Sequence, residues 1–342
     1  MNQAYSYDDV LLVPQYSDIR SRSEIDIGTD LGKGVKLSLP VIASPMDTIS
    51  GARMAAAMSV AGGTAVIHRY NTPPEQREEV ATFASKTTSG AIVGAAIGVN
   101  GEYLKRARRL FNAGATFFCV DVAHGHHIKV KEALIALRQE FGDSVHIMAG
   151  NVATLRGVND LADWGADSVR CNIGGGSICS TRIQTGHGLP GLETIFECAQ
   201  TTRDVKIIAD GGIKNSGDMV KALAAGADAV MIGSLLSGTS ETPGSVLKGK
   251  DGMAWKAYRG MASKEAQMDW HGKYSSFEGV ATQVPYRGPV SMILEDLERG
   301  IRSGFSYSGA RTLPELQAKA HFIRQTTSGL SESHTHILGR RW

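Results

Sequence analysis

The sequence predicts a single-domain α/β fold, a (β/α)8 barrel of parallel strands. Three observations lead to this fold class: short apolar runs that recur along the chain, helix-like stretches between them, and polar or glycine residues that gather just after the runs. A parallel barrel accounts for all three. Its strands are buried on both faces, its helices return the chain to the other end, and its functional residues follow the carboxyl ends of the strands.

Eight short apolar runs have the composition of strands that are buried on both faces. Each is rich in β-branched and other apolar side chains, and none alternates cleanly between polar and apolar residues. A doubly wound open sheet is the main alternative. It is expected to carry a Gly-x-Gly-x-x-Gly motif after its first strand, but here that run leads into residues 44–48, Ser-Pro-Met-Asp-Thr. The eight runs occupy residues 40–44, 64–68, 91–97, 116–121, 145–149, 168–171, 205–209 and 227–232.

Helix-like stretches lie between the runs, with apolar residues at a spacing of three to four positions. Residues 103–113, 129–140 and 217–225 are examples, and residues 313–324 are expected to form a final helix. Several stretches end in Ala-Gly or Trp-Gly, which indicates a glycine that closes the helix in a left-handed conformation. Eight strands that alternate with helices in this way are typical of a TIM barrel.

The whole chain, residues 1–342, is expected to form one catalytic barrel domain. Residues 1–39 precede the first strand and are expected to cover the bottom or the edge of the barrel. Residues 237–288 are polar and rich in glycine, which indicates a long active-site loop region. Residues 326–342 are expected to form a loose C-terminal tail that docks on a neighbouring subunit.

The composition excludes several classes of protein. Lysine and arginine number 36 against 34 aspartate and glutamate residues, so no basic excess points to a nucleic acid or a membrane surface as a partner. The N-terminus has no basic segment followed by an apolar one, and no apolar run is long enough to span a membrane. The four cysteines show no metal-ligand spacing, so zinc is not expected. Disulfides are not expected in a chain of this length with so few cysteines. We therefore expect a cytoplasmic protein.

Polar and glycine residues follow the predicted strands, where a barrel places its active site. The longest connection carries residues 172–182, in which three consecutive glycines let the backbone approach a ligand and Cys179 follows as a candidate nucleophile. A mobile glycine-rich loop with an inert thiol is the less specific interpretation. Cys119, Cys171 and Cys198 lie in predicted strands or helices, so we expect these three thiols to be buried.

Two further strand ends indicate a nucleotide site. Residues 209–212 and 232–234 contain glycines at the place where many barrels bind phosphate through backbone N–H groups. Ser234 can donate a hydroxyl, and the Asp210 carboxylate can accept hydrogen bonds from both hydroxyls of a ribose. Three histidines, at positions 124, 126 and 127, lie in one polar loop without a carboxylate at regular spacing, so we expect loop residues near a cofactor and not a metal site.

These motifs resemble those of the IMP dehydrogenase/GMP reductase family, and the resemblance extends over almost the whole chain. It is specific, because many motifs occur in the same order. It implies a barrel enzyme that performs redox chemistry on a purine nucleoside monophosphate with a nicotinamide cofactor. The motifs are residues 7–14 (YDDVLLVP), 44–48 (SPMDT), 120–126 (VDVAHGH), 149–154 (AGNVAT), 174–182 (GGGSICSTR), 208–212 (IADGG), 231–234 (MIGS) and 258–261 (YRGM).

The resemblance also implies a role for each matching residue. Cys179 would be the nucleophile that adds to C2 of the purine, with Thr181 and Glu278 as further catalytic residues. Asp121 and Asn151 would contact the cofactor. The implied nucleotide contacts are Asp210 to the ribose, Gly260 and Met261 to the base, Ser177, Gly212, Gly233, Ser234 and Tyr258 to the phosphate, and in addition Ser44 and Met46.

The family further implies a homotetramer and a monovalent cation, expected to be potassium. The carbonyls of Gly174, Gly176 and Cys179 would bind this ion. A Glu-Ser-His tripeptide of an adjacent subunit would complete the site, and Glu332, Ser333 and His334 match it. Two residues depart from the usual family loop, because Gly175 replaces a proline and Ser180 replaces a threonine, which loosens the loop.

The resemblance leaves two reactions open. A GMP reductase uses NADPH to convert GMP to IMP and ammonia, and an IMP dehydrogenase uses NAD and water to convert IMP to XMP. The segment between Met261 and Glu278 is short and lacks the Arg-Tyr pair of the dehydrogenase flap; its nearest pair is Lys273-Tyr274. No regulatory insert separates the second and third predicted strands. Both features favour the reductase.

Other features favour the dehydrogenase. Tyr258-Arg259-Gly260-Met261 and the Glu-Ser-His tripeptide at residues 332–334 are closer to that enzyme. A third hypothesis is a purine nucleotide-binding protein without activity, which would need only the phosphate and ribose contacts. The presence of Cys179, Thr181 and Glu278 together argues against it.

Overall fold

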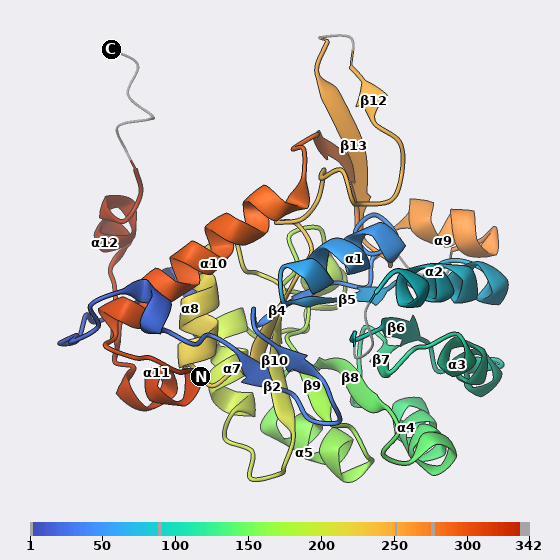
Figure 1. Ribbon diagram of the computed structural model, residues 1–342, viewed down its shortest axis with the longest axis horizontal. Helices are drawn as coiled ribbons and strands as arrows, with labels where there is room; N and C mark the ends of the chain where they lie inside the picture. Colours follow the sequence, from blue (N-terminus) through green and yellow to red (C-terminus); the bar gives the residue numbers. More distant parts are fainter. Residues whose placement is uncertain (1–2, 88–90, 250–251, 275–277, 336–342) are drawn as a thin grey trace.

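The computed structural model describes residues 3–87, 91–249, 252–274 and 278–335. Within these residues, eight parallel strands close into a barrel in the order β10-β11-β4-β5-β6-β7-β8-β9, with helices around the outside (Figure 1). The predicted TIM barrel is therefore confirmed, and each strand overlaps one of the predicted runs. The strands are β4 Val41–Ala43, β5 Thr64–Ile67, β6 Gly94–Ile97, β7 Phe117–Asp121, β8 His146–Val152, β9 Ser168–Cys171, β10 Lys206–Asp210 and β11 Ala229–Ile232.

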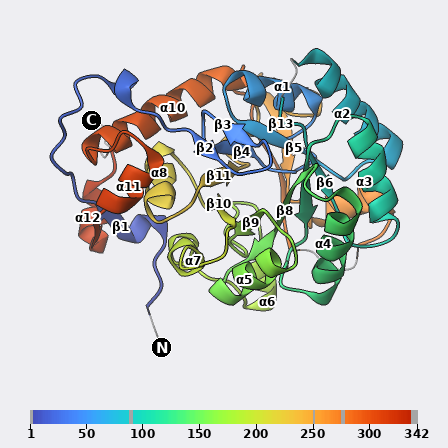
Figure 2. The ribbon, with the colours of Figure 1, turned by 60° about the horizontal axis from the view of Figure 1, so that its bottom comes forward.

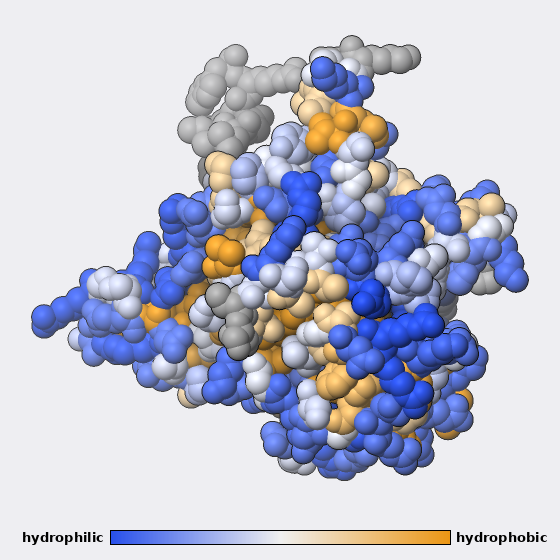
Figure 3. Space-filling view, turned by 45° about the vertical axis from the view of Figure 1, so that its right-hand side comes forward, coloured by the Kyte–Doolittle hydropathy of each residue, from blue (hydrophilic) through white to orange (hydrophobic). Residues whose placement is uncertain are grey.

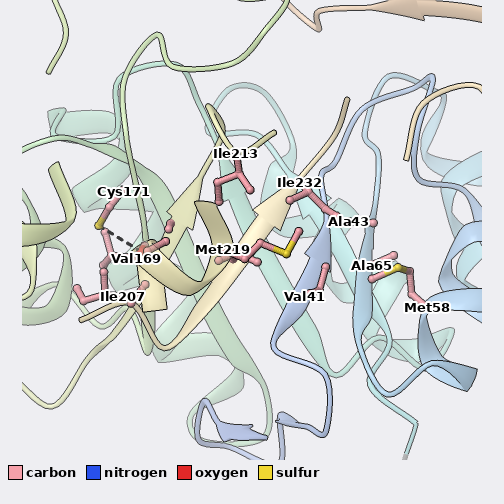
Figure 4. Packing of buried hydrophobic residues seen from close by; sticks show 14 of the residues in the cluster. Val41, Ala43, Met58, Ala65, Val169, Cys171, Ile207, Ile213, Met219 and Ile232 are labelled. Carbon is pink, nitrogen blue, oxygen red and sulfur yellow. Dashed lines mark hydrogen bonds between the residues drawn. The ribbon is translucent and has the colours of Figure 1, made fainter. Parts of the chain in front are cut away.

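Alternate residues of the barrel strands belong to two separate hydrophobic clusters. Ile42 of β4 joins a cluster with Phe117 of β7 inside the barrel. Its neighbours Val41 and Ala43 belong to the cluster between the strands and the helices, with Met58 of α1 (Figure 4). Because both faces of each strand are covered, an uninterrupted apolar run is required, and this explains why the runs show no polar alternation.

Removal of an interior side chain should destabilise the barrel strongly. We expect Phe117→Ala to lower the free energy of unfolding by about 3–5 kcal/mol, because the side chain is fully buried and its loss leaves a cavity. Phe111→Ala is the matched control, since Phe111 lies on α3 and is 38% exposed. Chemical denaturation of both variants measures the effect. Equal losses of unfolding free energy in the two variants would contradict the place of Phe117 in the barrel interior.

The predicted helices at residues 103–113, 129–140 and 217–225 are confirmed as α3 (Tyr103–Asn112), α4 (Ile128–Phe141) and α8 (Ser216–Ala224). Gly114 and Gly226 follow α3 and α8 with φ of 106° and 114°, as the Ala-Gly endings predict. The other helices that surround the barrel are α1 Ala52–Val60, α2 Pro73–Lys86, α5 Leu155–Asp163, α6 Thr181–Thr185, α7 Gly191–Cys198 and α10 Val290–Tyr307.

The N-terminal segment reaches the amino-terminal end of the barrel. A hairpin of β2 (Thr29–Asp30) and β3 (Lys36–Leu37) lies there (Figure 2). Leu31 and Val35, in and beside its turn, join the interior cluster and close the barrel from below. The remaining elements of this segment are η1 Tyr7–Asp9, β1 Val10–Leu12 and η2 Arg22–Glu24.

Residues 237–288, expected to be a loop region, instead contain a small antiparallel sheet that projects from the barrel (Figure 1). No apolar run marks its strands, because Lys256 and Tyr258 are the buried positions of β13. Apolar side chains are exposed on this projecting part (Figure 3), among them Val246, Leu247 and Met253. The elements are β12 Leu247–Lys248, β13 Ala254–Arg259, α9 Lys264–His271 and β14 Ala281–Pro285.

The predicted final helix at residues 313–324 is too long. Helix α11 covers Leu313–Lys319, and Phe322–Arg324 form β15, which pairs antiparallel with β1. The tail, expected to be loose, begins with helix α12 (Thr327–Glu332), and residues 336–342 lie outside the described residues. Among the helices described, none is long and apolar enough to cross a membrane.

Candidate active site

A cavity of about 330 Å³ opens at the carboxyl ends of the barrel strands. Strand ends supply its floor, and the loop after β9 and the residues around β13 and β14 supply its walls. The predicted residues come together here, which the fold class requires of strand-end residues. The cavity is lined by Ser44, Met46, Asp121, Asn151, Gly174, Gly176, Ser177, Cys179, Thr181, Asp210, Gly212, Gly233, Ser234, Tyr258, Gly260, Met261 and Glu278.

The loop after β9 is braced by two side chains that fill the space beside its glycines. A Cβ on Gly175 would lie 2.1 Å from Nδ2 of Asn172, and a Cβ on Gly174 would lie 2.5 Å from Cγ of Arg182. Arg182 donates hydrogen bonds to the carbonyl of Ile173 (3.0 Å) and to Oδ1 of Asn172 (3.1 Å). Glycine at position 175, where the family usually has proline, therefore accompanies close packing of Asn172 against the loop.

Cys179, Thr181 and Glu278 form a continuous line of polar groups. The Cys179 Sγ lies 3.1 Å from Oγ1 of Thr181, and this hydroxyl donates a hydrogen bond of 2.8 Å to Oε2 of Glu278. Backbone pairing fixes the two segments, because the Ser180 N–H donates to the Glu278 carbonyl at 2.9 Å. A thiol, a hydroxyl and a carboxylate in this order can move a proton between a group bound near the sulfur and the carboxylate.

Hydroxyl groups and glycine backbone come together in another part of the cavity lining. Oγ of Ser177 lies 3.4 Å from the Tyr258 hydroxyl. Burial raises the pKa of Tyr258, although hydrogen bonding to Ser177 and Ser234 opposes this shift, so the phenol remains a neutral donor. Gly211 and Gly212 have φ of 82° and 77°, a region that favours glycine. Neutral hydroxyl donors and the backbone N–H groups of these glycines suit a phosphate group.

Asp121 and Asp210 lie on either side of a buried arginine. Arg170 Nη1 donates to Oδ1 of Asp121 at 2.7 Å, and its Nε and Nη2 donate to Oδ2 of Asp210 at 3.1 and 2.9 Å. Asn151 Nδ2 donates to the same Oδ2 at 2.7 Å. In the described part of the chain, these three bonds to Asp210 all end on Oδ2, which leaves Oδ1 for a ligand in the cavity.

Sequence reasoning missed Arg170 and Tyr70, which also line the cavity, whereas Arg69, another residue of the lining, is predicted as one of the residues just after a strand. Arg170 lies inside the predicted run at residues 168–171, where it was counted as part of an apolar strand. A charged side chain in a buried strand requires a partner, and this rule is the signal that could have identified it.

The tripeptide Glu332, Ser333 and His334 does not reach the cavity of its own chain. It lies at the end of α12, at the edge of the molecule beyond α10 and α11 (Figure 1). Its contribution to an adjacent subunit therefore stays a prediction.

The histidines and the other cysteines have structural contacts. His126 Nε2 lies 2.7 Å from Oδ2 of Asp160, and Nδ1 of His127 caps α4 by accepting the Lys129 N–H. No group of histidine, cysteine and carboxylate residues in the described ranges could hold a metal ion. Cys119 is buried as expected, and burial raises the pKa of its thiol to about 12; Cys198 is buried as well.

Comparison with known proteins places the chain in a family. A family model for the IMP dehydrogenase / GMP reductase domain matches residues 4–336. The chain belongs to the IMP dehydrogenase/GMP reductase family. The resemblance seen in the sequence motifs is therefore confirmed, and the matched region includes the cavity and all its predicted residues.

The chain is similar both to IMP dehydrogenases and to GMP reductases. It is 33% identical to inosine-5'-monophosphate dehydrogenase of Nitrosopumilus maritimus, an alignment that covers 98% of each chain. It is 31% identical to GMP reductase of Leishmania donovani, over 99% of this chain and 98% of the relative. A solved structure of a GMP reductase variant from Trypanosoma brucei in complex with guanosine 5'-monophosphate has a TM-score of 0.91, 31% identity and 98% coverage of both chains.

The family membership fixes the general function. Members are oxidoreductases of purine nucleotide metabolism that use nicotinamide cofactors, and the similar structure holds a purine nucleotide. The identities to the dehydrogenase and to the reductase are nearly equal, so the reaction itself has to be argued from the site.

Proposed function

We propose that this chain is a GMP reductase, which converts GMP and NADPH to IMP, ammonia and NADP⁺. The observation that carries the proposal is the line from Cys179 through Thr181 to Glu278, with distances of 3.1 and 2.8 Å. A proton source near the sulfur is what the departure of an amino group from the attacked carbon requires.

In the first step the Cys179 thiol passes its proton through the Thr181 hydroxyl to Glu278, the thiolate adds to C2 of GMP, and the electron pair moves to the ring nitrogen. Glu278 then delivers a proton through the Thr181 hydroxyl to the amino group on C2. The C–N bond breaks, ammonia leaves, and the purine remains joined to Cys179 at C2. The thiol, the hydroxyl and the carboxylate thus act in the order in which they lie in the cavity.

When bound, the reduced nicotinamide supplies a hydride to C2. The C–S bond then breaks, the thiolate of Cys179 re-forms, and IMP leaves. GMP, NADPH and one proton thereby give IMP, NADP⁺ and ammonia. Two residues on the cofactor side fit a nicotinamide: Asn151 uses its amide N–H groups on Asn172 and Asp210, so its Oδ1 can accept from a carboxamide, and Asp121 lies beside it in the lining.

The other lining groups fit the rest of the nucleotide. Ser177, Ser234 and Tyr258 offer hydroxyls for the phosphate, near the backbone of Gly212 and Gly233. The Met46 sulfur lies against Gly233, at 3.0 Å from the place of a Cβ, and Met261 accepts the Asp47 N–H at 3.3 Å, so both thioethers are held in the wall beside the base site.

Asp210 is proposed to bind the ribose, and its replacement should weaken nucleotide binding. We expect Asp210→Asn to raise the dissociation constant of GMP about 10- to 100-fold, because a hydrogen bond to a charged group contributes about 1.5–3 kcal/mol. Asparagine is the better variant here, since alanine would also remove a partner of the buried Arg170. Calorimetric titration with GMP measures the effect, and an unchanged dissociation constant would argue against the ribose contact.

An IMP dehydrogenase is the second candidate. Tyr258-Arg259-Gly260-Met261 favours it, and so do the dehydrogenase relatives. Hydrolysis of a purine–cysteine adduct needs a base for water. Lys273, in the pair nearest to the family's Arg-Tyr, is exposed and is not among the residues that line the cavity. The helix of this segment, α9, is held to the barrel by Trp270, whose ring stacks on Tyr70 at 4.0 Å.

A potassium ion and a homotetramer belong to the proposal as well. Carbonyl oxygens are suitable ligands for potassium. Gly174, Gly176 and Cys179 would provide three of them; the Gly176 carbonyl also accepts the Cys179 N–H at 3.1 Å and keeps a second lone pair. Glu332, Ser333 and His334 of a neighbouring copy would complete the ligand set.

Initial rates with two substrate pairs test the reaction. GMP with NADPH should be consumed, while IMP with NAD should give little or no reduced cofactor. No reaction with either pair, despite nucleotide binding, would favour the binding protein without activity.

A further inference from the structure

A chain of four charged side chains crosses the mouth of the barrel. Arg69 Nε lies 3.3 Å from Oδ2 of Asp121, and its Nη2 donates to the Asp121 carbonyl at 3.0 Å. Arg170 joins Asp121 to Asp210 through the bonds of 2.7, 2.9 and 3.1 Å. Because the signs alternate, the set is neutral, and each arginine lies next to a carboxylate of the proposed site.

All four side chains are largely removed from water. The exposed fraction is 17% for Arg69, 15% for Asp121, 8% for Arg170 and 11% for Asp210. Burial alone would lower the pKa of Arg170 and raise that of Asp121. The opposite charges outweigh it, so the pKa of Arg170 lies well above and that of Asp121 below its usual value. Charges in such a medium are poorly screened, and a change at one end is felt at the other.

The middle of this chain has little freedom to move. Arg170 stands on β9, opposite Gly150 of β8 and Ile208 of β10. A Cβ on Gly150 would lie 2.6 Å from the Cβ of Arg170, so the strands pack tightly around its base. The guanidinium is planar and presents its N–H groups at fixed spacing. Movement of one carboxylate must therefore displace the other or break a hydrogen bond.

We propose that Arg170 is a positioning residue that couples nucleotide binding at Asp210 to nicotinamide dinucleotide binding at Asp121. This inference rests on the proposed function, because it takes Asp210 to face the ribose and Asp121 to face the cofactor. A ligand that orders one carboxylate orders Arg170, and Arg170 orders the other carboxylate before the second ligand arrives. The two ligands then strengthen each other's binding by the same factor, as thermodynamic linkage requires.

Calorimetry with GMP and NADP⁺ measures this factor without turnover, because GMP has no hydride to give and NADP⁺ has none to transfer. In the unmodified protein, saturating GMP should lower the dissociation constant of NADP⁺ about fivefold or more. Arg170→Lys keeps the charge and removes the planar fork, so the factor should fall to about one. Arg138→Lys is the matched control: Arg138 also binds a carboxylate, Asp167 at 2.6 Å, but lies outside the cavity lining, and the factor should stay unchanged.

Asp121→Asn gives a second, independent test if the Arg170→Lys protein does not fold, since it weakens the same chain of charges on the cofactor side of Arg170. It too should bring the factor to about one, whatever its effect on each separate affinity. A factor of one in the unmodified protein, or the same factor in Arg170→Lys, would overturn the proposal. If the two ligands bind independently in a protein that reduces GMP, the coupling is refuted and the proposed reaction stands. Coupled binding in a protein that does not reduce GMP would support the coupling and refute the proposed reaction.

Discussion

Cys179→Ala should reduce turnover of GMP about 10³-fold or more, because Cys179 is the one thiol among the described residues of the cavity lining, and its loss removes the covalent bond to C2. The thiol lies 3.1 Å from the Thr181 hydroxyl and lines the cavity, so its reaction partner is in place. Affinity for GMP should change little, since the phosphate and ribose contacts supply most of the binding in the ground state.

Two measurements separate a loss of turnover from a loss of affinity in Cys179→Ala: the initial rate of NADPH oxidation, and the dissociation constant of GMP from calorimetry. Cys198→Ala is the control, because Cys198 is a buried thiol on α7 outside the cavity lining, and the activity of this variant should be retained. Turnover in Cys179→Ala above about a tenth of the unmodified rate would rule out a nucleophilic role.

Glu278→Gln should lower kcat about 10²- to 10⁴-fold, the range expected when a proton-transfer group is removed. Glutamine can still accept the hydrogen bond that the Thr181 hydroxyl makes at 2.8 Å, but it cannot pass a proton through that hydroxyl to the departing amino group. The loss should therefore appear in the release of ammonia, with a small change in the KM for GMP. Glu265→Gln is the control, because Glu265 is an exposed glutamate on α9.

Thr181→Val tests whether the hydroxyl and the carboxylate act as one unit. It removes the hydroxyl between the sulfur and the carboxylate, and kcat should fall about as far as it does in Glu278→Gln. The variant with both substitutions should be no slower than the slower single variant, since groups that act together are not additive. Losses that multiply would mean that the two residues act separately.

The barrel could be predicted from sequence because its strands are buried on both faces. Runs such as residues 64–68 and 91–97 supply apolar side chains both to the interior cluster and to the cluster beneath the helices, and this requirement is visible locally. Gly114 and Gly226 likewise mark helix ends through their own backbone conformation. The position of the site could be predicted from the barrel, because the carboxyl ends of its parallel strands meet on the same side.

The elements that were missed depend on contacts far along the chain. Phe322–Arg324 form a strand only because β1, at the other end of the sequence, pairs with them. The antiparallel sheet around β13 has few buried positions, so its polar sequence resembled a loop. Arg170 was counted as part of an apolar strand, and only the strand order and the hydrogen bonds show that Asp121 and Asp210 lie on either side of it.

The central claim is the reductive removal of the amino group, and product stoichiometry tests it most directly. The protein is incubated with GMP and NADPH, and IMP, ammonia and oxidised cofactor are quantified in the same sample, with a parallel sample of IMP and NAD assayed for XMP. We expect equal amounts of IMP, ammonia and NADP⁺ from the first sample and little or no XMP from the second. Steady formation of XMP, faster than the consumption of GMP, would contradict the reductase and identify the chain as a dehydrogenase.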